Sequence, residues 1–132
     1  MSQNGDVKAL KVVLIILAVI AFVYGFGFLF VPGILVGLSR ANPVEFSWLR
    51  WMGGVVIALG IGALMVSSKP EKQGIFVTSM ALATLFAGLG NLYSWIMQEY
   101  SGATWFTALP TCFLLVLSAL LWWGRVQAKG IL

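Results

Sequence analysis

Polar and titratable side chains are scarce in this chain of 132 residues, so the few beside apolar stretches define where chemistry would occur. Arg50 lies between Trp48 and Trp51, at the start of a long uncharged stretch. A guanidinium at such a boundary can bind a carboxylate or phosphate, stack on an indole, or hold its charge in the headgroup layer. Two interpretations of Arg50 follow: a site for an anion or lipid headgroup, and a membrane anchor that clamps two helices.

Asn91 is the one amide inside an apolar stretch. An asparagine in hydrocarbon needs a hydrogen-bond partner, either on a neighbouring helix or on a ligand. Its position in the chain places Asn91 near the membrane level of Arg50, and Tyr24 of the first apolar stretch can reach the same layer. Glu99 follows the stretch that holds Asn91, so its carboxylate is a candidate partner for Arg50. We predict that these four residues form either a polar layer between helices or the contacts of a ligand site.

Catalysis has little support in the remaining side chains. Glu45 and Glu99 are expected near helix ends, where capping and ion pairing are commoner roles than acid–base catalysis. The chain has no histidine, which excludes histidine ligands and histidine bases. Its single cysteine, Cys112, excludes an internal disulfide and a paired-cysteine redox centre. We therefore predict no catalytic residue, no metal site, no cofactor and no enzymatic activity.

The elements that position these residues are predicted from composition. The chain is 61% hydrophobic and 9% charged, with a mean hydropathy of +1.00, whereas soluble domains carry about 25% charge. Four stretches (12–38, 51–68, 73–98 and 100–124) contain no Asp, Glu, Lys or Arg. Three of them exceed the roughly 20 residues that a helix needs to cross a bilayer, and 51–68 comes close to that length. We predict an all-α polytopic membrane protein, one domain over residues 1–132 with four transmembrane helices in an up-down bundle.

The expected helices cover about 8–30, 43–67, 71–98 and 103–125, after a polar tail at 1–7. Residues 31–40 are too short to span again, so an interfacial helical turn or a re-entrant segment is expected there. Asn42, Pro43 and Glu45 have the pattern of a helix start. Six Lys and Arg residues fall on the side of the termini and two on the other, which places both termini in the cytoplasm. The orientation of the chain in the membrane thus explains its excess of Lys and Arg residues, and no nucleic-acid partner is expected.

Small residues recur at every fourth position in two of the predicted helices. Such spacing places them on one helix face, where they allow close approach of another helix. Packing within the chain is the simpler interpretation, and an interface with a second copy or a partner protein is the alternative. The two predicted packing faces are Gly54, Ala58 and Gly62 in the second helix, and Ser79, Ala83 and Ala87 in the third.

Three local motifs carry a resemblance to a known family. They are the Pro-containing turn Phe30-Val-Pro-Gly, the sequence Arg50-Trp-Met-Gly-Gly, and the Gly54, Ala58 and Gly62 spacing that follows it. Over about residues 10–98 the layout resembles an uncharacterised bacterial family of small four-helix membrane proteins, a domain of unknown function. The resemblance implies a four-helix fold in the bacterial cytoplasmic (inner) membrane. It implies no activity.

We therefore predict a non-enzymatic membrane protein that acts by helix packing, as an accessory or assembly subunit of a membrane complex or as a small oligomer. Its partners would be membrane lipids, other membrane subunits or itself. The alternative is a binding protein or carrier for a lipid or another apolar small molecule, with Arg50, Asn91 and Tyr24 as polar contacts. An ion-coupled transporter ranks lower, because no ionisable residue is expected at mid-membrane.

Overall fold

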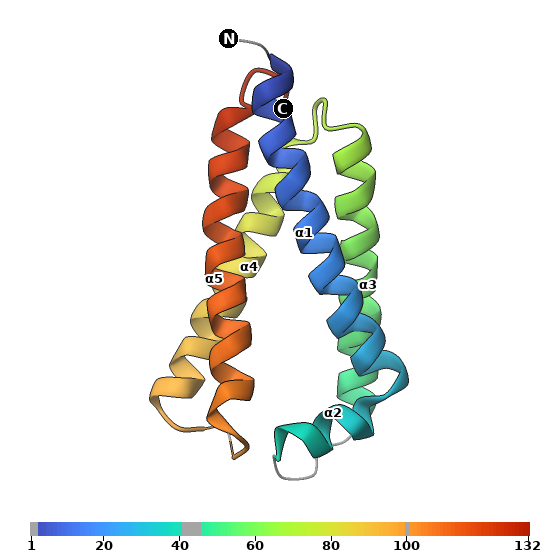
Figure 1. Ribbon diagram of the computed structural model, residues 1–132, viewed down its shortest axis with the longest axis vertical. Coiled ribbons are helices and arrows are strands. Elements are labelled where there is room, and N and C mark those ends of the chain that lie inside the picture. The colour runs from blue at the N-terminus through green and yellow to red at the C-terminus, as the bar shows by residue number, and fades with distance from the viewer. Residues whose placement is uncertain (1–2, 41–45, 100) are drawn as a thin grey trace.

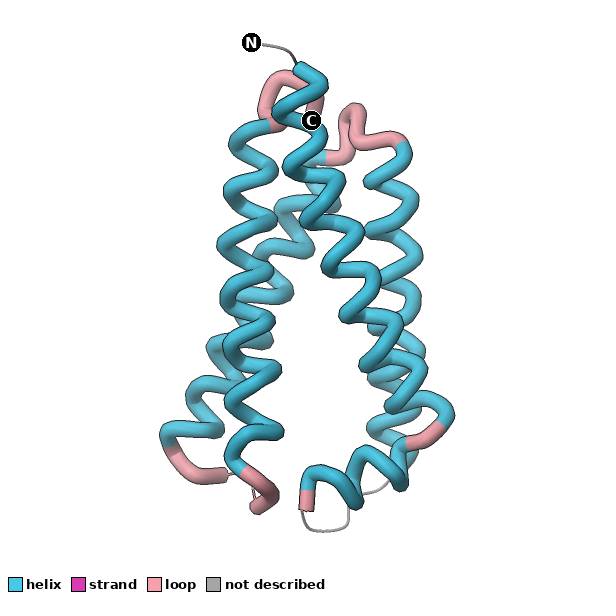
Figure 2. The backbone as a smooth tube through the Cα atoms, viewed as in Figure 1, coloured by secondary structure: helices cyan, strands magenta, loops and turns pink. Residues whose placement is uncertain are grey.

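The computed structural model describes residues 3–40, 46–99 and 101–132, and all the regular secondary structure in them is helical. Four helices are long and apolar enough to cross a membrane, and Figure 2 shows the loops confined to the two ends of the molecule. The predicted all-α class is confirmed. The helices are α1 (Gln3–Phe30), α2 (Pro32–Ser39), α3 (Phe46–Ser68), α4 (Gly74–Ile96) and α5 (Thr104–Gln127) (Figure 1).

The first helix begins earlier than expected. Residues 3–7 belong to α1, so the prediction of a polar tail over 1–7 is wrong for this part. A helix that is already nucleated by its apolar stretch extends by further residues at little cost in free energy. The helix start predicted at Asn42, Pro43 and Glu45 lies outside the described residues.

The short segment after α1 forms a helix of its own, in agreement with the predicted helical turn, and its place at the membrane interface stays a prediction. Pro32 is the first residue of α2, a position where its missing N–H costs nothing. The helix has eight residues and lies across the ends of the long helices, away from the termini (Figure 1). Arg40 ends it in the left-handed conformation, with a φ of 57°. The chain is thus turned between α1 and α3 without a second span.

The long helices form two pairs, α1 with α3 and α4 with α5. The pairs meet along α1 and α5 at the end that holds both termini, and they diverge toward the end that holds α2 (Figure 1). Successive long helices run in opposite directions, as the up-down prediction requires. The side of the membrane on which the termini lie stays a prediction.

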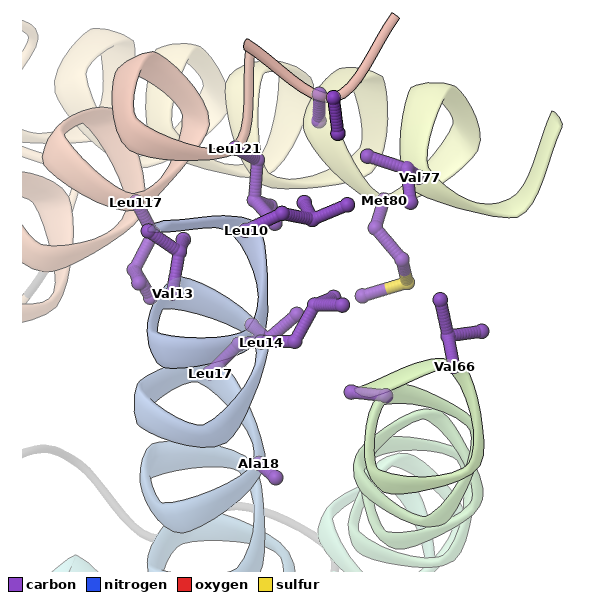
Figure 3. Close-up of a cluster of buried hydrophobic side chains, with 13 residues drawn as sticks. Leu10, Val13, Leu14, Leu17, Ala18, Val66, Val77, Met80, Leu117 and Leu121 are labelled. Carbon is purple, nitrogen blue, oxygen red and sulfur yellow. The ribbon is translucent and has the colours of Figure 1, made fainter. Parts of the chain in front are cut away.

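The buried core joins the two pairs near the termini. Leu10, Leu14 and Leu121 are fully buried, and Met80 of α4 extends into the space between Leu14 of α1 and Val66 of α3 (Figure 3). Branched and unbranched apolar side chains from all four long helices meet in this cluster. Its members are Leu10, Val13, Leu14, Leu17, Ala18, Ala63, Val66, Val77, Met80, Ala81, Leu117, Leu121 and Ala128.

Within the α1–α3 pair the backbones touch at two glycines. A Cβ atom added to Gly53 would lie 2.6 Å from the carbonyl oxygen of Gly25 and 2.7 Å from the backbone nitrogen of Leu29. One added to Gly25 would lie 2.6 Å from a side-chain carbon of Ile57. Because only residues without a Cβ permit this separation, the sequence at these two positions sets how closely α1 and α3 approach.

The predicted packing faces are not the ones that the chain uses internally. Gly54 and Ala58 are exposed, and Gly62 is half-buried, opposite the ring of Phe76. Neighbouring residues on a helix project about 100° apart, so the face that contains Gly54 points in a different direction from the face that contains Gly53. The interpretation as internal packing is therefore wrong for Gly54 and Ala58 and for the α4 face, where Ser79, Ala83 and Ala87 are all exposed. The residues buried instead are Gly53, Gly60, Ala63 and Val66 on α3 and Val77, Met80, Ala81, Thr84 and Gly88 on α4.

Candidate functional site

Arg50 acts on the end of a neighbouring helix. Its Nη1 donates a hydrogen bond of 2.7 Å to the carbonyl oxygen of Leu29, in the last turn of α1. The last carbonyls of a helix lack donors within the helix and carry the negative end of its dipole, so a cation there is favoured. Trp48 and Trp51 pack edge to face on each other, with ring centroids 6.4 Å apart. The geometry supports the clamp interpretation of Arg50.

The expected pairing of Arg50 with Glu99 is not formed in the described part of the chain. Glu99 follows α4, and its Oε1 accepts a hydrogen bond of 2.9 Å from the hydroxyl of Ser94. Arg50 belongs to the other helix pair, at the end where the pairs diverge (Figure 1). Glu45, the other acid on this side of the predicted membrane, lies outside the described residues.

Asn91 and Tyr24 are both half-buried, on different pairs. No hydrogen bond joins the Asn91 amide to any described residue, and the ring of Tyr24 packs on Phe28 at a centroid distance of 6.0 Å. Because α4 makes its extensive contacts with α5 and not with α1 or α3, Asn91 is separated from Tyr24 and Arg50. The structure therefore does not bring Arg50, Asn91, Tyr24 and Glu99 together in one site.

The α4–α5 pair holds polar contacts that sequence reasoning missed. Arg125 Nε donates to the hydroxyl of Thr78 at 2.5 Å, and the guanidinium lies 5.6 Å from the ring centroid of Trp122. Ser118 donates to the carbonyl oxygen of Ala81 at 2.9 Å, in the buried contact between the helices. The available signal was the spacing of Trp122 and Arg125, three residues apart on one helix face. In the sequence alone, Arg125 is one of the six positive charges that predict the orientation of the chain in the membrane.

Two hollows lie along this pair. One, of about 440 Å³, is lined mainly by apolar residues at the middle of the pair and near Arg125. The other, of about 490 Å³, lies at the α2 end of the molecule and is lined by Ser94, Trp95, Gln98, Gly102, Thr104 and Thr107. Neither includes Arg50, Asn91 or Tyr24. The residues that line the first are Ala81, Leu82, Leu85, Leu115, Ser118, Ala119 and Trp122.

Among the described residues, no group of three or more histidine, cysteine, aspartate or glutamate side chains is placed to hold a metal ion. Cys112 is a free thiol on the exposed side of α5. Comparison of the chain with protein-family models, curated proteins and solved structures gives no match. The resemblance to a bacterial family therefore stays a prediction from the sequence.

Proposed function

We propose that this chain acts as a non-enzymatic integral membrane protein through helix packing, as an accessory or assembly subunit of a membrane complex or as a small oligomer. One observation carries the proposal: two helix faces built from small residues are left uncovered by the rest of the described residues. On α3, Gly54 and Ala58 are exposed, and a Cβ added to Gly54 would meet nothing within 4 Å. The exposed face of α4 consists of Ser79, Ala83 and Ala87.

In a bilayer, small residues on an exposed helix face indicate where another helix can pack. Lipid tails are as apolar as leucine, so transmembrane helices associate by close packing and polar contacts rather than by expelling water. Within the chain, α1 and α3 pack closely in this way, because Gly25 and Gly53 allow their backbones to come into contact. Exposed faces of the same type on α3 and α4 are suited to a helix from outside the chain.

The charges of the chain favour packing over transport. The stretches 51–68 and 73–98 contain no Asp, Glu, Lys or Arg, and ion-coupled transport usually uses an ionisable residue inside the membrane. The carrier alternative has less support, because its proposed polar contacts, Arg50, Asn91 and Tyr24, are distributed over both helix pairs and line no common hollow.

The test is the mass of the full chain and any bound protein after extraction in mild detergent. We expect the wild type to be an oligomer or to retain a stoichiometric membrane partner. Ala58→Leu or Ala83→Leu would release it, because a bulky side chain separates the helices. Cys112→Leu is the matched control, since it enlarges an exposed small residue on α5, away from both faces. A wild-type protein that is monomeric and free of other proteins would contradict the proposal.

A further inference from the structure

We propose that the α4–α5 pair binds an anionic phospholipid at the end of the molecule that holds the termini. Arg125 would bind the lipid phosphate, and the hollow lined by Leu82, Leu85, Leu115 and Ala119 would hold an acyl chain. This site goes beyond the proposed function, and it uses neither of the small-residue faces. It lies on the opposite end of the molecule from Arg50.

Arg125 is held in a fixed orientation at the helix boundary. Its Nε–H is used by the hydroxyl of Thr78, across the helix pair, and its plane lies near the ring of Trp122. The other N–H groups of the guanidinium make no hydrogen bond with any described residue. A guanidinium presents its donors in a planar fork that matches phosphate oxygens. Two neighbours thus orient the group and leave its phosphate-binding edge available.

The apolar hollow lies next to Arg125, because the Trp122 ring both lines the hollow and lies beside the guanidinium. Along α4 the residues run from Thr78, which bonds Arg125, to Leu82 and Leu85 inside the hollow. Leu85 lies seven positions after Thr78 along α4, about 10 Å at 1.5 Å per residue. The hollow, of about 440 Å³, therefore extends from Trp122, which lies beside the guanidinium, toward the middle of the helix pair. A charged group above an apolar groove matches the two parts of a phospholipid.

The surrounding charge favours an anionic headgroup. This end of the chain carries Lys8, Lys11, Lys69, Lys72, Arg125 and Lys129, against two acids, Asp6 and Glu71. The α4 helix begins at Gly74, so the positive end of its dipole lies one turn from Thr78. Basic pockets between transmembrane helices are known to hold anionic lipid headgroups. A zwitterionic lipid would carry its own cation into this positive field and is disfavoured.

A lipid fits these observations better than the other occupants. Free phosphate would use Arg125 but leave the apolar hollow empty. A second copy of this chain would bring its own positive end to the same place, and like charges there repel. Only a phospholipid has a charged headgroup for Arg125 and, directly below it, an acyl chain for the apolar hollow.

The test is native mass spectrometry of the full chain in mild detergent, with dioleoyl phosphatidylglycerol and dioleoyl phosphatidylcholine added in equal amounts. We expect the wild type to retain one phosphatidylglycerol in preference to phosphatidylcholine. Arg125→Gln should lower the apparent affinity for phosphatidylglycerol by roughly tenfold, the effect of losing hydrogen bonds from a charged donor. Lys129→Gln removes an equal charge from an exposed position nearby and should leave the affinity within about twofold.

A second variant keeps the test valid if Arg125→Gln fails to fold. Ala119→Leu leaves the Arg125–Thr78 contact in place and fills the hollow, so we expect it to release the lipid. Equal retention of the two lipids by the wild type, or equal effects of Arg125→Gln and Lys129→Gln, would overturn the proposal. So would displacement of the lipid by millimolar inorganic phosphate, or a change in oligomer mass without a change in lipid binding in Ala119→Leu.

Discussion

Two adjacent glycines allow a sharp test of how α1 and α3 are held together. Gly53 packs against the α1 backbone, where an added Cβ would lie 2.6 Å from the Gly25 oxygen and 2.7 Å from the Leu29 nitrogen. Gly54 is exposed, and an added Cβ would meet nothing within 4 Å. Gly53→Ala and Gly54→Ala are therefore the same chemical change, made one residue apart on the same helix.

The expected difference follows from two terms. Alanine is favoured over glycine in a helix interior by about 0.8–1.0 kcal/mol, and this gain is common to both variants. Overpacking costs about 1–3 kcal/mol, and only Gly53→Ala incurs it, because its obstacles are backbone atoms that cannot rotate away. We therefore expect Gly53→Ala to be less stable than Gly54→Ala by about 1–3 kcal/mol.

The hydrogen bond from Arg50 to Leu29 allows a second test of the same contact between α1 and α3. Relieving the clash at Gly53 moves α1 away from α3 at Leu29, whose carbonyl oxygen accepts the 2.7 Å bond from Arg50. Gly53→Ala should then weaken this bond as well. Because the two sites are coupled, the double variant Gly53→Ala with Arg50→Gln should lose less stability than the sum of the two single variants.

The assay is equilibrium unfolding of the full chain in mixed micelles of a mild detergent and sodium dodecyl sulfate, followed by far-ultraviolet circular dichroism. Protein concentration is varied, so that dissociation is distinguished from unfolding. Equal unfolding midpoints for Gly53→Ala and Gly54→Ala would refute the backbone contact between α1 and α3. Strict additivity with Arg50→Gln would refute the coupling to the clamp.

Two further substitutions test polar contacts between helices. Arg50→Gln should lower the free energy of unfolding by about 0.5–1.5 kcal/mol through the bond to Leu29, without changing the oligomeric state; unchanged stability in the same micelles would count against the clamp. Ser118→Ala should cost about 0.6 kcal/mol, because the buried hydroxyl donates to the carbonyl of Ala81. Ser79→Ala, at an exposed hydroxyl with no hydrogen bond to a described residue, is its control, and an equal loss in both would contradict this reasoning.

The spans were predictable because they depend on a property summed over many residues. A helix that crosses a bilayer needs about 20 apolar residues, and the loss or gain of one hardly changes the sum. The positions of Pro32 and Pro70 also mark ends of helices locally, since proline disfavours a helical conformation in the residue before it. The spans therefore agree with the structure to within a few residues, apart from the early start of α1 at Gln3.

The helix faces were not predictable from the sequence in the same way. On α3 both Gly53 and Gly54 are small: Gly54 is followed at four-residue spacing by Ala58 and Gly62, and Gly53 is buried together with Gly60 and Ala63. Which of the two meets α1 depends on Gly25, 28 positions earlier in the sequence. In a soluble protein the polar side of a helix would mark the exposed face, but in lipid both sides are apolar. The information that selects the face is carried by the partner helix.

The prediction that Arg50, Asn91, Tyr24 and Glu99 form one polar layer was wrong for a related reason. Counting residues from the helix ends gives the depth of Arg50 and Asn91 in the membrane, but it does not give their lateral distance. That distance depends on how the two pairs diverge, and the divergence follows from where the core lies. Because Leu10, Leu14 and Leu121 join the pairs near the termini, α3 and α4 lie apart at the opposite end, where they carry Arg50 and Asn91.

The two arginines that clamp helices stabilise the pairs separately. Arg50 donates to α1 from α3, and Arg125 donates to Thr78 of α4 from α5, so each works within its own pair. Among the described residues, the pairs are joined by the apolar core and by backbone hydrogen bonds near the two ends, from Lys72 to Ile131 and from Ala103 to Ser39. Apolar contacts between helices compete with lipid on nearly equal terms. Gly54 and Ala58 of α3 and the exposed face of α4 (Ser79, Ala83 and Ala87) take no part in this joint, and no described residue covers them, so we expect lipid or a partner helix to do so.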